Sequence, residues 1–85
     1  MRYVYVVVID WATEFESDFN IRIYDNEQAA INFLEEYIDN EKESSWYNEL
    51  SNRIEDRTKR SWECYEDGDW VCNHSSIYIR KELVR

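Results

Sequence analysis

The sequence predicts a single α+β domain, in which a five-stranded, mostly antiparallel sheet carries two helices on one face. Three observations favour this fold. Eighty-five residues leave room for one hydrophobic core. Segments rich in β-branched and aromatic residues stand near both ends of the chain, and a segment with helical periodicity lies between them. Strands and helices that are segregated in this way are typical of α+β domains. We expect residues 1–85 to form one domain with the order β-β-α-α-β-β-β.

Two strands are expected at the start of the chain, joined by a polar connection over residues 11–17. Residues 2–10 are β-branched or aromatic with apolar side chains at both parities, which is typical of a strand covered on both faces. Residues 18–24 alternate strictly, so one set of side chains should face the core and the other the solvent. The inward set is expected to be Phe19, Ile21 and Ile23, and the outward set Asn20, Arg22 and Tyr24.

The first helix is expected directly after the second strand. Asp25 is a suitable N-cap, and Gln28, three residues later, is a suitable capping-box partner. The helix is expected to end near Asn40. Its apolar residues have the spacing of a helix with one buried face: Ala30, Phe33, Leu34, Tyr37 and Ile38.

A second, weaker helix is predicted from Ser44 or Ser45 to about Arg57. Its inner side would carry Trp46, Leu50 and Ile54. Acidic residues precede basic ones by four positions, a spacing that stabilises helices by about 0.2–0.5 kcal/mol for each pair. These pairs are Glu49–Arg53, Glu55–Lys59 and Asp56–Arg60. The basic residues are then expected near the C-terminus of the helix, where cations complement its dipole.

Three strands are expected after the helices, at residues 60–66, 69–73 and 76–84. Asp67-Gly68 is a hairpin signal between the first two. A two-residue turn and a three-residue turn with Gly68 in the left-handed position are both possible. The longer turn is preferred because register follows the hydrophobic pattern. It gathers four side chains on one face: Trp62, Cys64, Trp70 and Cys72.

Catalytic, cofactor and metal sites are not indicated. Cys64, Cys72 and His74 lack the paired spacing of structural zinc sites. The preferred register places the two cysteines diagonally, roughly 7 Å apart at Cβ, so buried thiols are expected rather than a disulfide. His74 is expected in an exposed turn, and nothing in the sequence orients it as a base for a nucleophile. We predict that the protein is not an enzyme.

The negative charge belongs to one half of the chain. Residues 10–49 hold twelve carboxylates against Arg22 and Lys42, whereas residues 50–85 are neutral overall and the chain totals −9. A field of this sign repels nucleic acid and anionic membranes and attracts basic protein surfaces. Solubility alone is an alternative reason for such a charge.

The candidate binding residues form two acidic groups. The first surrounds two aromatic residues in the expected hairpin loop: Asp10, Trp11, Glu14, Phe15, Glu16 and Asp18. The second lies on or just after the solvent side of the first helix: Glu35, Glu36, Asp39, Glu41 and Glu43. Aromatic side chains ringed by charge are a common interface design. In the alternative, Trp11 and Phe15 fold back over the core.

The run Tyr3–Ile9 (YVYVVVI) followed by Asp25–Ala30 (DNEQAA), in a short, acidic chain without Pro, resembles the small acidic proteins encoded by bacteriophages and other mobile elements. These include anti-CRISPR and related anti-defence inhibitors. The resemblance covers the chain in size and charge. It implies a non-enzymatic inhibitor that occupies a basic, nucleic-acid-binding surface with carboxylates in the place of phosphates, in the cytoplasm of a bacterial host.

The function expected from the sequence is therefore that of a protein-binding inhibitor or adaptor, partly a nucleic-acid mimic. Its partner would be the basic surface of a nucleic-acid-handling protein, with no direct contact to nucleic acid or membrane. The apolar run at residues 3–9 is too short to span a bilayer, and no signal peptide is recognised. Two alternatives remain: a protein that binds or sequesters a nucleotide-like small ligand, and an obligate homodimeric module.

Overall fold

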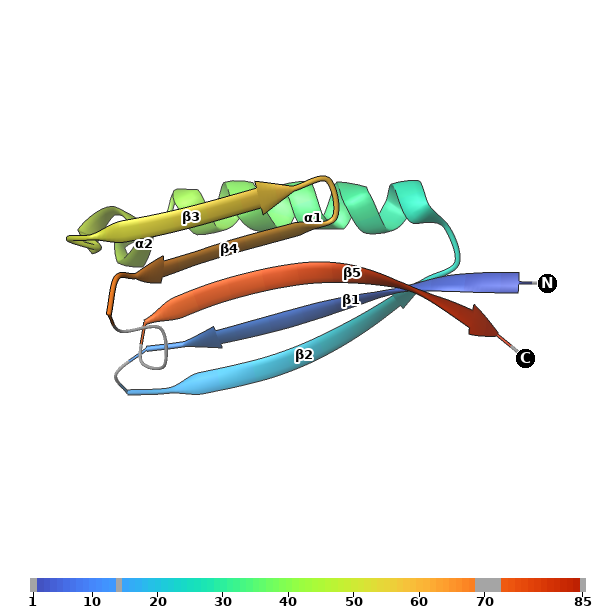
Figure 1. Cartoon of the computed structure of the whole chain (residues 1–85), viewed down its shortest axis with the longest axis horizontal. Helices are drawn as coiled ribbons and strands as arrows, with labels where there is room; N and C mark the ends of the chain where they lie inside the picture. Colours follow the sequence, from blue (N-terminus) through green and yellow to red (C-terminus); the bar gives the residue numbers. More distant parts are fainter. Residues whose placement is uncertain (1, 14, 69–72, 85) are drawn as a thin grey trace.

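A computed structural model describes residues 2–13, 15–68 and 73–84 of the chain. It confirms the α+β class and the expected order of elements (Figure 1). The elements are β1 (Arg2–Ala12), β2 (Ser17–Tyr24), α1 (Glu27–Lys42), α2 (Ser45–Glu49), β3 (Arg53–Thr58), β4 (Ser61–Glu66) and β5 (His74–Val84).

The five strands form one antiparallel sheet in the order β2-β1-β5-β4-β3. β1 and β5 pair along their whole length, from Arg2 opposite Val84 to Ala12 opposite His74. Both ends of the chain therefore lie at the same end of the sheet (Figure 1). The domain is elongated, with principal extents of 46 × 20 × 17 Å. α1 runs along one face of the sheet, nearly parallel to the strands (Figure 1).

Both helices begin at side-chain caps. Asn26, one residue after the expected Asp25, caps α1 by accepting a hydrogen bond from the backbone N–H of Ala29 at 3.1 Å. α1 ends at Lys42, slightly beyond the expected end. Ser44 caps α2 as expected, and its hydroxyl accepts a bond from the N–H of Tyr47 at 3.2 Å.

The hydrophobic core lies between α1 and the sheet. Ala30, Leu34 and Ile38 form the buried stripe of α1, as the helical spacing predicted. The sheet supplies six buried residues to this core: Val7, Ile9, Trp62, Cys64, Ile77 and Ile79. Trp62 and Cys64 share the buried face as expected. Neighbouring Val7 and Val8 of β1 are both buried, although α1 covers only the face of Val7.

The expected facing of β2 is wrong. Arg22 pairs with Val7, whose side chain faces α1, and Ile21 pairs with Val8 on the opposite face. The apolar set of β2 is therefore exposed: Phe19, Ile21 and Ile23 are 60%, 49% and 67% accessible. On the helix side, the Arg22 guanidinium lies 4.6 Å from the centre of the Phe33 ring. The alternation of apolar and polar residues in β2 divides the side chains into two sets, but the position of α1 decides which set faces the helix.

The second helix is much shorter than predicted. α2 ends at Glu49, and residues 53–58 form β3, which pairs with β4. The acidic and basic side chains spaced four residues apart stabilise a helix too little to extend α2 through these residues. The basic side chains instead form ion pairs with α1: Arg57 of β3 pairs with Glu35, and Arg60, in the turn after β3, pairs with Glu27. The expected C-terminal position of the basic cluster in a helix is therefore also wrong.

The partners of β4 differ from the predicted hairpin. β4 pairs with β3 along one edge and with β5 along the other. Most of the strand expected at 69–73, including Trp70 and Cys72, lies outside the described residues. Gly68 has the positive φ, 83°, that was expected of it in the turn.

Candidate functional site

The sheet face opposite α1 carries no helix, and it is called the open face here. Three cross-strand rows define it, following the register of the strands. The rows are Ile23–Val6–Arg80, Ile21–Val8–Tyr78–Ser61 and Phe19–Asp10–Ser76–Glu63–Asp56. The open face therefore has an apolar half, centred on β2, and a polar half, which runs along the row from Asp10 to Asp56.

The apolar half is a contiguous patch of large exposed side chains. Phe19, Ile21 and Ile23 alternate along β2, and Tyr78 on β5 is 39% accessible. Val6 lies between Ile23 and Arg80 and is half-buried. Contiguous exposed apolar surface on a small domain marks sites of interaction with other macromolecules.

The polar half holds an acidic row. Asp10, Glu63 and Asp56 lie on one row across four strands, with Ser76 between Asp10 and Glu63. Glu63 and Asp56 stand directly opposite each other, an arrangement that destabilises antiparallel strands. The three carboxylates line a shallow hollow of about 310 Å³ that also reaches Tyr78. The acidic row is therefore set directly beside the apolar patch.

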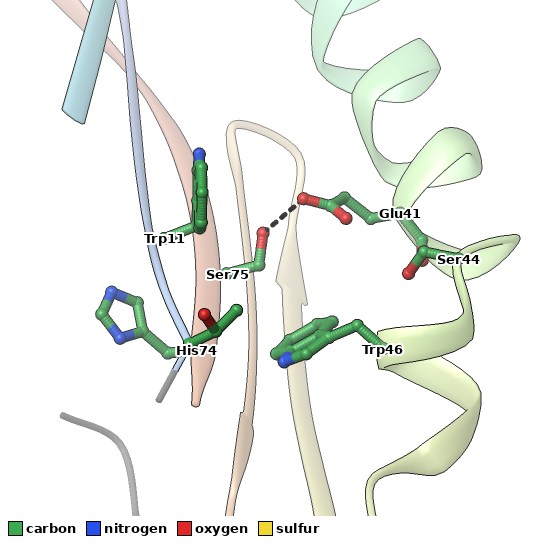
Figure 2. A pocket seen from close by; sticks show the side chains of 7 residues that line it. Trp11, Glu41, Ser44, Trp46, His74 and Ser75 are labelled. Carbon is green, nitrogen blue, oxygen red and sulfur yellow. Dashed lines mark hydrogen bonds between the residues drawn. The ribbon is translucent and has the colours of Figure 1, made fainter. Parts of the chain in front are cut away.

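A separate cavity of about 230 Å³ lies where the end of α1, α2 and the ends of β1 and β5 meet. Its lining comprises Trp11, Thr13, Glu41, Ser44, Trp46, His74 and Ser75 (Figure 2). Trp side chains from β1 and α2 thus share one cavity with a carboxylate.

A short hydrogen-bond chain fixes the carboxylate of this cavity. Ser75 Oγ donates to Glu41 Oε1 at 2.9 Å, and Tyr37 Oη lies 2.7 Å from Ser75 Oγ. Because the one hydroxyl proton of Ser75 goes to Glu41, Tyr37 is the donor to Ser75. Burial raises the pKa of Tyr37, opposed by its hydrogen bond to Ser75 and reinforced by the charge of Glu41. The phenol therefore stays protonated and remains a donor.

Two nitrogen-bearing side chains lie at this end of the sheet, and the His74 ring points away from Trp46 and Glu41 (Figure 2). His74, expected in an exposed turn, is instead 4% accessible because it begins β5 and pairs with Ala12 and Tyr65 on either side. Its Nε2 lies 3.3 Å from Asp10 Oδ1. The Nε1–H of Trp46 is buried and has no hydrogen-bond partner within the described part of the chain. A buried donor without a partner costs about 1–3 kcal/mol.

The first predicted group of residues is divided by the structure. Asp10 lies on the open face, whereas Trp11 points to the other face and lines the cavity. Phe15 is 93% accessible at the tip of the β1–β2 hairpin, so it does not fold back over the core. Glu16 and Asp18 are exposed beside it. Glu14 lies outside the described residues.

The second predicted group is divided as well. Glu35 pairs with Arg57, and Glu41 turns inward to Ser75. The other members, Glu36, Asp39 and Glu43, are exposed, and within residues 2–13, 15–68 and 73–84 they form no ion pair. The structure therefore brings Trp11 from the first group and Glu41 from the second to the same cavity.

Sequence reasoning missed Trp46, His74 and Ser75 as cavity residues and Asp56 and Glu63 as members of the open face. Trp46 had been assigned to the core side of a long helix. A Trp two residues after the capping Ser44 was the one available signal, but Ser75 and His74 are set in place by the pairing of β5 with β1, which is a long-range contact.

Metal and thiol chemistry find little support in the described residues. No group of three or more His, Cys, Asp or Glu side chains there could hold a metal ion. Cys64 is a free, fully buried thiol, and burial raises its pKa to about 11. No helix in the described segments is long and apolar enough to cross a membrane.

Comparison with protein-family models gave no match, and comparisons with curated proteins and with solved structures gave none either. The function is therefore argued from the open face and the cavity alone.

Proposed function

We propose that the protein is a non-enzymatic inhibitor or adaptor that binds a basic surface of a partner protein through its open face. The observation that carries this proposal is the acidic row Asp10–Glu63–Asp56 set beside the exposed apolar residues of β2. A fitting partner offers Lys or Arg side chains next to an apolar strip. We expect such a surface on a nucleic-acid-handling protein in the bacterial cytoplasm, where the carboxylates would take the place of phosphates.

The open face has the size of a protein interface. Five strands spaced about 4.8 Å apart and eight residue steps of about 3.4 Å along β1 give a face of about 24 by 27 Å, or about 650 Å². A standard interface covers about 800 Å² on each partner. A partner that also contacts the hairpin tip at Phe15 would reach that area.

The charge of the chain favours a basic partner. The net charge of −9 steers cationic surfaces toward the protein, and exposed Glu36, Asp39 and Glu43 add to this field from the helix side. Mobile ions screen such attraction over about 8–10 Å. Binding to the partner should therefore weaken as the salt concentration rises.

The test is capture from a bacterial lysate with three tagged proteins. The open-face variant carries Ile21→Thr, Glu63→Gln and Asp56→Asn, and the matched helix variant carries Glu36→Gln and Asp39→Asn. We expect wild type and the helix variant to retain the same nucleic-acid-handling protein and the open-face variant to lose it. Loss with the helix variant alone, or equal retention by all three, would refute the assignment to the open face.

A second copy of the chain is the other candidate occupant, and one observation favours it. Arg80 lies two residues beyond Tyr78 along β5, while Ser76, opposite Asp10, lies two residues before it. A two-fold axis along the row Val8–Tyr78 would therefore place Arg80 of each copy over the acidic row of the other. Sedimentation equilibrium at micromolar concentration tests this, since a monomer excludes the homodimer.

A further inference from the structure

The cavity between Trp11 and Trp46 is separate from the open face, and protein binding by that face makes no use of it. We propose that this cavity is a binding site for a small organic cation, an ammonium or guanidinium group on a short apolar stem. Three properties of the cavity lead to this chemistry: its aromatic walls, its anchored carboxylate and its size.

The walls suit a cation with an apolar stem. Trp11 approaches from the end of β1, and Trp46 approaches from α2 on the opposite side of the cavity (Figure 2). Trp is the aromatic side chain that attracts cations most strongly, because its ring carries the largest negative potential on its face. The same rings bury the methylene groups of a stem, so one ligand can use both properties.

The carboxylate supplies the counter-charge. Glu41 Oε1 accepts the hydrogen bond from Ser75, and a carboxylate has further acceptor positions on its two oxygens for a cation. Tyr37 holds Ser75 in turn, so the carboxylate is fixed before a ligand arrives. Charge-assisted hydrogen bonds from a cation to such an oxygen are stronger than bonds between neutral groups. A fixed anion between two aromatic faces favours an ammonium or guanidinium group over a neutral one.

The volume of the cavity and the negative charge of the protein restrict the ligand further. A volume of about 230 Å³ is below the range of about 300–1,000 Å³ that is usual for drug-sized ligands. The cavity therefore fits a small cation on a short stem rather than a drug-sized ligand. The carboxylate of Glu41 in the cavity and the net charge of −9 disfavour a phosphate-bearing ligand. The cavity thus argues against the nucleotide-like ligand considered from the sequence.

The cation can be a free small molecule or the end of a side chain on a partner protein. A small amine from solution and the end of a Lys or Arg side chain on a partner present the same chemistry. The buried Nε1–H of Trp46, which lacks an acceptor within the described residues, gives a ligand with an oxygen near its charge one further bond.

Titrations followed by the indole N–H signals in NMR spectra of the whole protein test the site. The probes are butylammonium and butylguanidinium, with 1-butanol as the neutral control. For ligands of this size we expect dissociation constants on the order of 0.1–1 mM, from typical affinities per heavy atom. The Trp11 and Trp46 signals, assigned from Trp→Phe variants, should move with both cations and stay in place with 1-butanol. Equal shifts with 1-butanol, or no shift at about 50 mM cation, would overturn the proposal.

Glu41→Gln is the decisive variant because its amide oxygen can still accept the bond from Ser75 while the charge is lost. It should weaken both cations about tenfold or more. Glu36→Gln, on the exposed side of the same helix, is the matched control and should bind as wild type. If Glu41→Gln changes the spectrum of the free protein, Trp11→Phe serves instead and should also weaken binding. Unchanged affinity in the charge-neutral variant would refute the role of Glu41.

The affinity for a fourth probe, N-acetyl-lysine-N-methylamide, distinguishes a free amine from a side chain of a partner. Tighter binding of this blocked amino acid than of butylammonium supports a side chain of a partner, and tighter binding of butylammonium supports a free amine. The open-face variant should bind all the cations as wild type does. The proposed cation site and the proposed partner interface on the open face can therefore be refuted independently of each other.

Discussion

The facing of β2 can be tested with one substitution at two positions of the sheet. Ile23 and Ile77 are both β-branched strand residues, but Ile23 is 67% accessible on the open face and Ile77 is fully buried against α1. We consider Ile23→Thr and Ile77→Thr. Threonine keeps the β-branch, so strand propensity changes little, and each substitution replaces an ethyl group by a hydroxyl.

The burial of the two residues sets very different costs. At Ile77 the loss of two buried carbons costs about 1.6 kcal/mol, and the hydroxyl enters an apolar core at a further cost of about 1–3 kcal/mol. The total is about 3–5 kcal/mol. At Ile23 only about a third of the side chain leaves water, and the hydroxyl stays hydrated, so the cost is about 0.5 kcal/mol.

The assay is urea denaturation followed by Trp fluorescence, with a thermal scan beside it. For a domain of this size each kcal/mol shifts Tm by about 4–8 °C, so Ile77→Thr should lower Tm by about 12 °C or more and Ile23→Thr by about 2–4 °C. If Ile77→Thr does not fold, Ile77→Val, with an expected cost of about 0.5–1.5 kcal/mol, replaces it. A larger loss at Ile23 than at Ile77 would refute the facing of β2. Each measurement is repeated at two protein concentrations, because a dimer through the open face would make Tm depend on concentration.

Three further predictions concern the helix side of the sheet. Leu34→Ala, at a fully buried position of α1, should cost about 2.7–5 kcal/mol in urea denaturation. Cys64 should react with iodoacetamide about 200-fold more slowly at pH 8 than a free thiol, by peptide mass mapping, because a pKa of about 11 leaves little thiolate. Burial opposes ionisation of Glu55, but hydrogen bonds from Trp62 at 2.8 Å and Tyr47 at 2.9 Å outweigh it and lower its pKa. The stability that this adds is present above the unfolded pKa of about 4.3 and is lost as the pH falls through the folded value. Glu55→Gln should therefore be less stable than wild type at pH 7, and the difference should shrink at pH 3.

The local signals of the sequence were sufficient for α1, for β1 and for the class of the fold. They failed at β2 because alternation divides side chains into two sets without saying which set is covered. In this sheet α1 lies on the side of Arg22 and Tyr24: Tyr24 packs against the core, Arg22 stays exposed with its guanidinium near Phe33, and the isoleucines lie on the other face. A rule that apolar side chains face inward is least secure where a sheet has one open face.

The third strand was missed for a different reason. Glu55, Asp56, Lys59 and Arg60 have helical spacing, so local reasoning continued α2 through them. The structure instead has a hairpin: β3 pairs with β4 across residues 59–60, and Glu55 accepts a hydrogen bond from Trp62. The two connecting residues, Lys59 and Arg60, are not among the usual hairpin turn signals, so the sequence did not indicate this turn.

The cavity shows the same limit. Its carboxylate and one of its Trp residues were singled out from the sequence, but as members of two separate surface groups. Ser75 joins them, because its position on β5 opposite Trp11 brings its hydroxyl to Glu41. The sequence therefore named two of the residues without the contact that makes them a site.

The distribution of paired and unpaired charge bears on why the chain is acidic. Cations of β3 and the following turn neutralise Glu35 and Glu27 on the helix side, through Arg57 and Arg60. Solubility alone would be served by carboxylates spread over any exposed surface. It does not require Asp56 opposite a second carboxylate in the sheet, an arrangement that costs stability, on the same face as exposed apolar residues. The proposed basic partner would contact this acidic row and the adjoining apolar patch together.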